Sequence, residues 1–164
     1  MKFIETYSNW ETTPKNVGWD YTSKDKIYYG IHIVKLTRNG KSVDVKAKFD
    51  TGARSSSIDF SVGEKLGISK ELISECEKLE NIEVPKTITK KEMKALEKKY
   101  TTEYKLKFPD ITSIQVSKSS SGFSLRAYIR LSINYASNNI DTEVNLRDRS
   151  GLSCEMLVGL SDMI

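Results

Sequence analysis

Apolar and polar residues alternate along much of this chain, a pattern typical of β-strands that bury one face. The first alternating segment runs from Ile27 to Leu36. The dipeptide Asn39-Gly40 follows it, and this pair favours a two-residue hairpin turn. On the return strand the apolar positions are Val43, Val45, Ala47 and Phe49. The pattern therefore predicts a β-hairpin that delivers Asp50 at its end.

The spacing of apolar residues becomes helical after a short strand predicted at Ser55 to Ile58. Ser69 is a candidate N-cap for a first helix, and Pro85 ends that segment. Its apolar stripe consists of Leu66, Leu72, Ile73, Cys76 and Leu79. Positions at this spacing indicate an amphipathic helix.

A second helix is predicted to open at Thr89, because Thr89 and Glu92 have the spacing of a capping box. We expect it to run through Lys99, with Met93 and Leu96 on a narrow apolar face. Together the two helices predict a helical hairpin that is inserted at about residues 61–103.

The β pattern returns after this insertion. The predicted strands are Tyr104 to Phe108, Ile111 to Val116, Phe123 to Tyr135, Ile140 to Leu146 and Met156 to Gly159. Several short strands at hairpin spacing predict a mainly β fold, either a small barrel or a sandwich. Residues 1–26 show no clear period and carry aromatic residues, so we expect an N-terminal arm there and one domain at 27–164. The residues that mark this arm are Trp10, Pro14, Trp19 and Tyr21.

The composition places the chain among soluble proteins. Its 164 residues suffice for one domain with a core, and 38% are hydrophobic and 29% charged. No apolar run reaches the roughly 18 residues that span a bilayer, and the N-terminus lacks the apolar core of a secretory signal. Cys76 and Cys154 lie far apart and indicate no disulfide framework, which favours a reducing, cytoplasmic setting.

Positive charge is concentrated in one segment. The formal net charge is +4, and the run from Lys86 to Lys107 supplies much of it. That run contains no arginine, so it is interpreted as a solvated helix face, and a nucleic-acid partner is not expected.

Several chemistries are excluded by what the sequence lacks. There is no Gly-rich phosphate loop or dinucleotide fingerprint. The single histidine, His32, lies in the middle of a strand and is interpreted as structural. With one histidine and no paired cysteines, a zinc site would need carboxylates alone, so we expect no metal and no cofactor. The serines Ser55 to Ser57 lack a nucleophile elbow and are interpreted as strand and turn residues.

Carboxylate chemistry is the reaction type that remains. Two facing aspartates cannot both ionise, so they share a proton and can activate a water molecule. The chain has one Asp-Thr-Gly, formed by Asp50, Thr51 and Gly52, and a second Asp50 would therefore have to come from a homodimer. An ordinary turn after a strand remains the alternative interpretation of this tripeptide.

Three segments resemble the retropepsin-like aspartic proteases in order and character: "KAKFDTGARSSSI", "VSKSSSGFSLRAYIRL" and "VNLRDRSGLSCEMLVG". They look most similar to the bacterial and phage family that is labelled ATP-dependent zinc proteases. The resemblance covers about residues 27–160, with the helical stretch 61–103 outside it. Neither an ATP site nor a zinc site is found in the sequence. The chain departs from the family at Leu160, where an arginine is usual, and in the short segment that follows it.

The resemblance implies a small closed acid-protease barrel with Asp50 as the catalytic residue. The other implied site residues are Thr51, Gly52 and Ala53 in the loop of Asp50, Leu157, Val158 and Gly159 packed behind that loop, and Ser119, Ser120, Ser121 and Gly122 as a flap over bound peptide. Arg126 and Arg147 also match the family and are interpreted first as surface or interface ion-pair partners.

These observations lead to one main hypothesis and two rivals. The main hypothesis is a homodimeric aspartic endopeptidase that cleaves a protein or peptide substrate without a metal, a cofactor or a membrane partner. The first rival is a catalytically inactive binding or assembly module of the same fold, in which Asp50 only stabilises a turn. The second is a weak nucleic-acid binder that uses the segment from Lys86 to Lys107.

Overall fold

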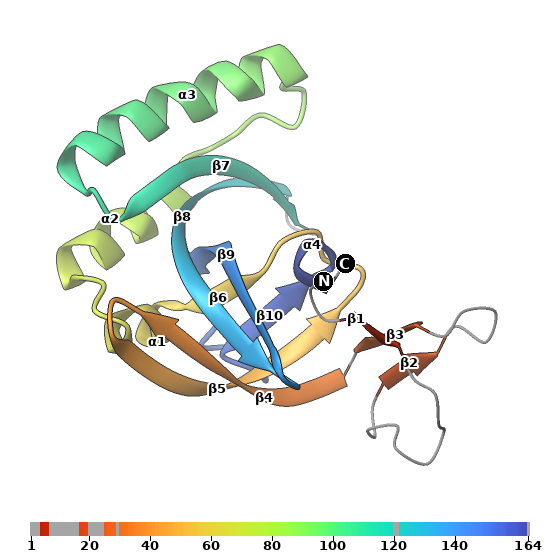
Figure 1. Ribbon diagram of the computed structural model, residues 1–164. Coiled ribbons are helices and arrows are strands. Elements are labelled where there is room, and N and C mark those ends of the chain that lie inside the picture. Colours follow the sequence, from red (N-terminus) through yellow and green to blue (C-terminus); the bar gives the residue numbers. More distant parts are fainter. Residues whose placement is uncertain (1–3, 7–16, 20–24, 29, 120–121, 164) are drawn as a thin grey trace.

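The computed structural model describes residues 4–6, 17–19, 25–28, 30–119 and 122–163. Most of the strands belong to one sheet with the order β4-β5-β10-β6-β9-β8-β7. Their bounds are β4 Gly30–Arg38, β5 Lys41–Asp50, β6 Ser57–Asp59, β7 Ile111–Ser119, β8 Gly122–Tyr135, β9 Asn138–Arg147 and β10 Met156–Gly159. Because β4 also pairs with β8, six strands close into a barrel and β7 is an extra strand at its edge (Figure 1).

The hairpin of β4 and β5 forms as predicted. Asn39 and Gly40 adopt positive φ angles of 48° and 78°, which the tight turn of a two-residue hairpin requires. The predicted apolar positions Val45, Ala47 and Phe49 are buried in the barrel. Burial of one such large apolar side chain contributes about 1.5–3 kcal/mol, so this alternation favours the observed register over a one-residue slip.

The strand β10 lies between β5 and β6, although β5 and β6 are consecutive in the chain. It runs parallel to β5 and antiparallel to β6, and β6 in turn runs parallel to β9. The chain therefore leaves the sheet after Asp50, passes over the end of β10 and re-enters as β6. This crossing brings the loop at residues 51–56 against the C-terminal segment.

Within the described ranges, four helices accompany the barrel. Their bounds are α1 Phe60–Lys65, α2 Lys70–Glu80, α3 Lys90–Lys107 and α4 Leu160–Met163. The predicted caps are confirmed: the Leu72 amide donates to Ser69 Oγ at 3.2 Å, and the Glu92 amide donates to Thr89 Oγ1 at 3.2 Å. Each capped amide removes one unsatisfied donor at a helix start.

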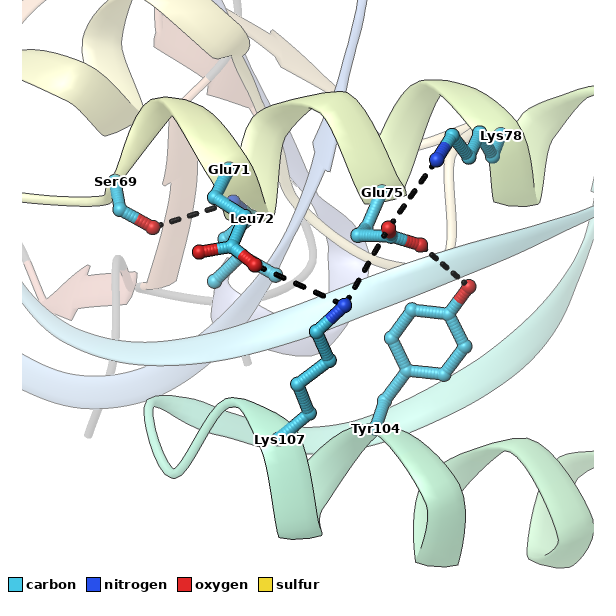
Figure 2. A network of polar contacts seen from close by, with 7 residues as sticks. All are labelled: Ser69, Glu71, Leu72, Glu75, Lys78, Tyr104 and Lys107. Atoms are coloured by element: carbon cyan, nitrogen blue, oxygen red, sulfur yellow. Dashed lines mark hydrogen bonds and ion pairs between the residues drawn. The ribbon is translucent and has the colours of Figure 1, made fainter.

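The two long helices attach to the barrel in different ways. The helix α2 buries its apolar stripe, which consists of Leu72, Ile73, Cys76 and Leu79, against β8 and β9. The helix α3 runs along the outside of β7 (Figure 1) and has no fully buried residue. Side chains at the end of α3 contact side chains of α2 (Figure 2). None of the described helices is long and apolar enough to cross a membrane.

One predicted strand is wrong. Tyr104 and the residues after it form the last turn of α3, and β7 starts only at Ile111. Tyr104 lies four residues after Tyr100 and before Phe108, and this spacing stacks the three rings at centroid distances of 6.2 and 6.5 Å. A strand would place Leu106 on the same face as Tyr104, whereas in the helix Leu106 is 84% exposed.

The N-terminal segment contains regular structure in the part that the structure describes. Three short strands, β1 Ile4–Thr6, β2 Val17–Trp19 and β3 Asp25–Tyr28, form an antiparallel sheet with β3 in the middle (Figure 1). Regular structure thus begins before residue 26. These strands were not predicted, because segments of three or four residues are too short to show a period. Trp10, Pro14 and Tyr21 lie outside the described residues.

Candidate active site around Asp50

Asp50 is the last residue of β5 and its side chain is half-buried. The Gly52 amide donates to Asp50 Oδ1 at 2.9 Å, and the Ala53 amide donates to the Asp50 carbonyl at 3.1 Å. A side chain on Gly52 would lie 3.1 Å from Asp50 Oδ1, so the glycine keeps this oxygen accessible. The side chain of Thr51 is exposed. The tripeptide is therefore a tight turn that also orients the carboxylate.

The loop after Asp50 packs against the end of β10. Gly159 pairs with Asp50 across the parallel strands. A side chain on Gly159 would lie 2.6 Å from the Ser55 carbonyl carbon and oxygen, so only glycine permits this approach. Two backbone hydrogen bonds continue the contact: the Leu160 amide donates to the Ala53 carbonyl at 2.8 Å, and the Ser161 amide donates to the Arg54 carbonyl at 3.1 Å. Val158 is buried beside these bonds.

A buried carboxylate closes the base of the loop. Asp162 is 2% exposed, and its two oxygens accept from Ser56 Oγ at 2.5 Å and from Thr142 Oγ1 at 2.6 Å. Ser56 Oγ in turn accepts from the Gly159 amide at 3.0 Å. The chain of bonds from Thr142 to Gly159 thus joins β9, α4, the loop and β10. No local sequence pattern indicates this chain of bonds, because its members lie up to 106 residues apart.

A cleft of about 1110 Å³ opens beside the loop. Gly52, Ala53 and Arg54 form its rim next to Asp50, and Leu157 reaches it from β10. The hairpin of β7 and β8 borders it, and so does the first half of α3. The cleft therefore lies between the Asp50 loop on one side and the hairpin on the other. Its volume of about 1110 Å³ is slightly above the roughly 300–1,000 Å³ typical of small-molecule pockets.

Arginine side chains gather in this cleft. Arg126, Arg147 and Arg149 line it, and the Nε atoms of Arg126 and Arg147 are buried without a hydrogen-bond partner among the described residues. Burial lowers the pKa of Arg126, and the nearby charge of Arg147 lowers it further. Arg126 keeps a bond of 3.4 Å from Nη1 to Asn145 Oδ1. The unsatisfied donors make this part of the cleft suited to an anionic group.

Arg126 and Arg147 form no surface ion pair among the described residues, and an ion pair at an interface stays a prediction. Both side chains line the cleft, and neither forms an ion pair with another described residue. Glu80, at the end of α2, supplies compensating charge to both arginines. Burial raises the pKa of Glu80, whereas the charges of the two arginines act against this increase. The cluster therefore retains uncompensated positive charge.

The hairpin tip lies only partly within the described residues. Ser119 pairs with Gly122 at the end of β7 and β8, and Ser120 and Ser121 lie outside the described residues. Below the tip, Val116 and Phe123 line the cleft. The hairpin therefore borders the cleft along its length.

His32 has the structural role that the sequence predicts. Its Nδ1 lies 2.7 Å from the Tyr135 hydroxyl, and its ring packs against Phe49 at a centroid distance of 5.4 Å. Among the described residues, no three His, Cys, Asp or Glu side chains are grouped so that they could hold a metal ion. The chemistry that this site offers is that of a carboxylate beside a basic cleft.

No family model and no curated protein matches the chain. Among solved structures, the chain is similar to a Legionella pneumophila protein of unknown function, DUF785. The two share 19% identity over 82% of this chain and 84% of the other, with a TM-score of 0.36. A likeness at this level identifies neither a family nor an activity.

Proposed function

We propose that the chain is one protomer of a homodimeric aspartic endopeptidase of the retropepsin type, with Asp50 as its catalytic residue. One observation carries the proposal: the Gly52 amide orients the Asp50 carboxylate on a loop that packs against the end of β10, and the following residues of that loop, Gly52 to Arg54, line a cleft of about 1110 Å³, although Asp50 itself is not among the lining residues. An ordinary turn would need neither the close approach of Gly159 nor the buried carboxylate of Asp162.

The mechanism follows from placing two such loops face to face across a two-fold axis. Two Asp50 carboxylates at hydrogen-bonding distance share one proton, because two like charges at that distance cannot both persist. The ionised carboxylate takes a proton from a water molecule, which then attacks the peptide carbonyl. The protonated carboxyl donates its proton toward the substrate. The rigid loop contributes by holding both carboxylates in the same plane.

The cleft supports a preference for acidic substrates. A carboxylate in the substrate would accept hydrogen bonds from the buried Nε donors of Arg126 and Arg147. Its negative charge would also offset the repulsion between the two guanidinium groups. Hydrogen bonds to charged groups contribute about 1.5–3 kcal/mol each, which corresponds to roughly 10- to 100-fold in kcat/KM. We therefore expect cleavage sites to have Asp or Glu near the scissile bond.

Cleavage of a diverse peptide library tests the catalytic residue. The library is incubated at high protein concentration between about pH 4 and pH 7, the range in which carboxylate pairs titrate. Asp50→Asn should abolish cleavage and keep the fold. Asp44→Asn is the matched control, because Asp44 is exposed on the same strand and should leave the rate unchanged.

The outcomes separate the proposal from its main rival. Cleavage that disappears in Asp50→Asn, and whose specific activity rises with protein concentration, supports a dimeric aspartic peptidase. Cleavage that survives in Asp50→Asn contradicts it. Absence of cleavage in a folded protein that is monomeric at every concentration favours the binding or assembly module.

The same library tests the substrate preference. Arg147→Gln should reduce cleavage of the acidic peptides at least about tenfold and should leave neutral peptides unaffected. Arg130 also lines the cleft, but it is exposed and pairs with Glu143 at 3.3 Å, so Arg130→Gln is the matched control. An equal loss for acidic and neutral peptides would contradict a charge-reading role.

A further inference from the structure

The outer edge of β7 is bonded by side chains of α3. Among the described strands, β7 has one neighbour, β8, so its other edge presents backbone groups that pair with no described strand. The Ile114 amide donates to Thr101 Oγ1 at 2.9 Å, and the same hydroxyl lies 3.2 Å from the Ile114 carbonyl, to which it donates. The Val116 amide donates to Glu97 Oε2 at 2.8 Å. Two side chains of α3 thus replace a neighbouring strand.

These polar bonds carry much of the attachment of α3. None of its residues is fully buried, and its partly buried core contacts come from Leu96, Tyr100 and Tyr104. Its first half also reaches the cleft, where Met93 and Glu97 line the wall. Glu97 therefore belongs to the cleft and to the β7 edge at once.

The far end of α3 is tied to α2 (Figure 2). Lys107 Nζ lies 3.7 Å from Glu71 Oε1 and 3.8 Å from Glu75 Oε1, and the Tyr104 hydroxyl donates to Glu75 Oε2 at 3.3 Å. Because α2 is embedded in the barrel through four buried side chains, this contact connects α3 to a fixed element. One end of α3 thus contacts α2, and its middle contacts the β7–β8 hairpin.

We propose that α3 is a brace that holds the β7–β8 hairpin at a set position over the cleft, with Glu97 and Thr101 as positioning residues for bound substrate. The consequence for substrate rests on the proposed function. A hairpin whose outer edge is occupied cannot pair there with another strand. It also cannot swing away from α3 without breaking the bonds to Ile114 and Val116. The hairpin and α3 are therefore expected to move as one unit.

Amide hydrogen exchange tests the brace without any assay of activity. In Glu97→Ala the Val116 amide, and in Thr101→Val the Ile114 amide, should exchange at least about tenfold faster than in the wild type. Glu97→Gln and Thr101→Ser keep an acceptor oxygen and should restore slow exchange. Glu103→Ala is the matched control, because Glu103 is exposed on the same helix. Unchanged exchange at both amides would overturn the brace.

Steady-state kinetics on a cleaved peptide test the role in substrate binding. Glu97→Ala and Thr101→Val should raise KM several-fold with kcat unchanged, and Glu97→Gln and Thr101→Ser should restore KM. Faster exchange with an unchanged KM would overturn the positioning role. If the wild type cleaves no peptide, the proposed function fails, whereas the exchange rates of Ile114 and Val116 still decide whether α3 braces the hairpin. Unfolding temperatures show whether each variant is folded.

Discussion

The two walls of the cleft are built from different kinds of contact. The loop wall, residues 50–56 with β10 and α4, is held by buried backbone bonds and by the Asp162 carboxylate. The brace wall, α3 with the β7–β8 hairpin, is held by half-buried side chains such as Glu97 and Thr101. A bond between buried groups is costly to break, whereas a half-exposed group can exchange its partner for water. We therefore expect the loop wall to be the more rigid of the two, and the proposed function assigns it the geometry of Asp50.

The largest effect is expected at the closest approach in the loop wall. Gly159→Ala places a methyl group 2.6 Å from the Ser55 backbone, so the loop must shift. We expect a loss of about 3 kcal/mol in unfolding free energy by urea denaturation. Peptidase activity should fall at least about 100-fold, because a small displacement of a catalytic group is sufficient for such a loss.

Gly151→Ala is the control for this substitution. Gly151 has no atom within 4 Å of an added side-chain carbon, so both stability and activity should stay near the wild-type values. If Gly159→Ala changed the unfolding free energy and activity as little as Gly151→Ala, the loop wall would be no more rigid than the brace wall.

A smaller loss is expected when the carboxylate beneath the loop is removed. Asp162→Ala leaves the hydroxyls of Ser56 and Thr142 without their acceptor, at a cost of about 2 kcal/mol in unfolding free energy. Asp162→Asn can still accept and donate one bond each, and it should retain most of the stability. Equal losses in the two variants would show that the charge of Asp162, rather than its hydrogen bonds, stabilises the loop.

The smallest effect concerns the contact between α3 and α2 at Glu75, and it depends on pH. Burial acts to raise the pKa of Glu75, but Lys78, Lys107 and the Tyr104 hydroxyl together hold it below its usual value of 4.5. A lowered pKa contributes stability that is present above pH 4.5 and is lost as the pH falls through the folded-state pKa. The contribution should stay below about 1 kcal/mol, because Lys78 and Lys107, the partners of Glu75, are exposed to solvent.

Unfolding temperatures of the wild type and Glu75→Gln measure this contribution. The difference between the two proteins should be constant near neutral pH and should shrink as the pH falls below 4.5. A difference that is independent of pH would mean that Glu75 acts through packing alone. Added salt should reduce the same difference, since exposed charges are screened.

Local elements were predicted where a few neighbouring residues decide the structure. The turn at Asn39-Gly40 and the caps at Ser69 and Thr89 depend on contacts within four residues, and all three are confirmed. The end of α3 was missed because the alternation around Leu106 fits a strand as well as a helix. Contacts of Tyr104 with Tyr100, Phe108 and Glu75 favour the helix, and they become visible only in the folded chain.

By itself, the sequence determined the strands of the barrel, the helix starts and the candidate carboxylate of Asp50, because each depends on periodicity or on adjacent residues. The tertiary structure alone decided that Asp162 lies beneath the loop, that Arg126 and Arg147 share a cleft, and that α3 covers the edge of β7. These placements depend on the crossing of β10 between β5 and β6 and on the closure of the barrel. Contacts between residues so distant in the chain leave no local pattern, since their spacing follows from topology rather than from the period of a helix or strand.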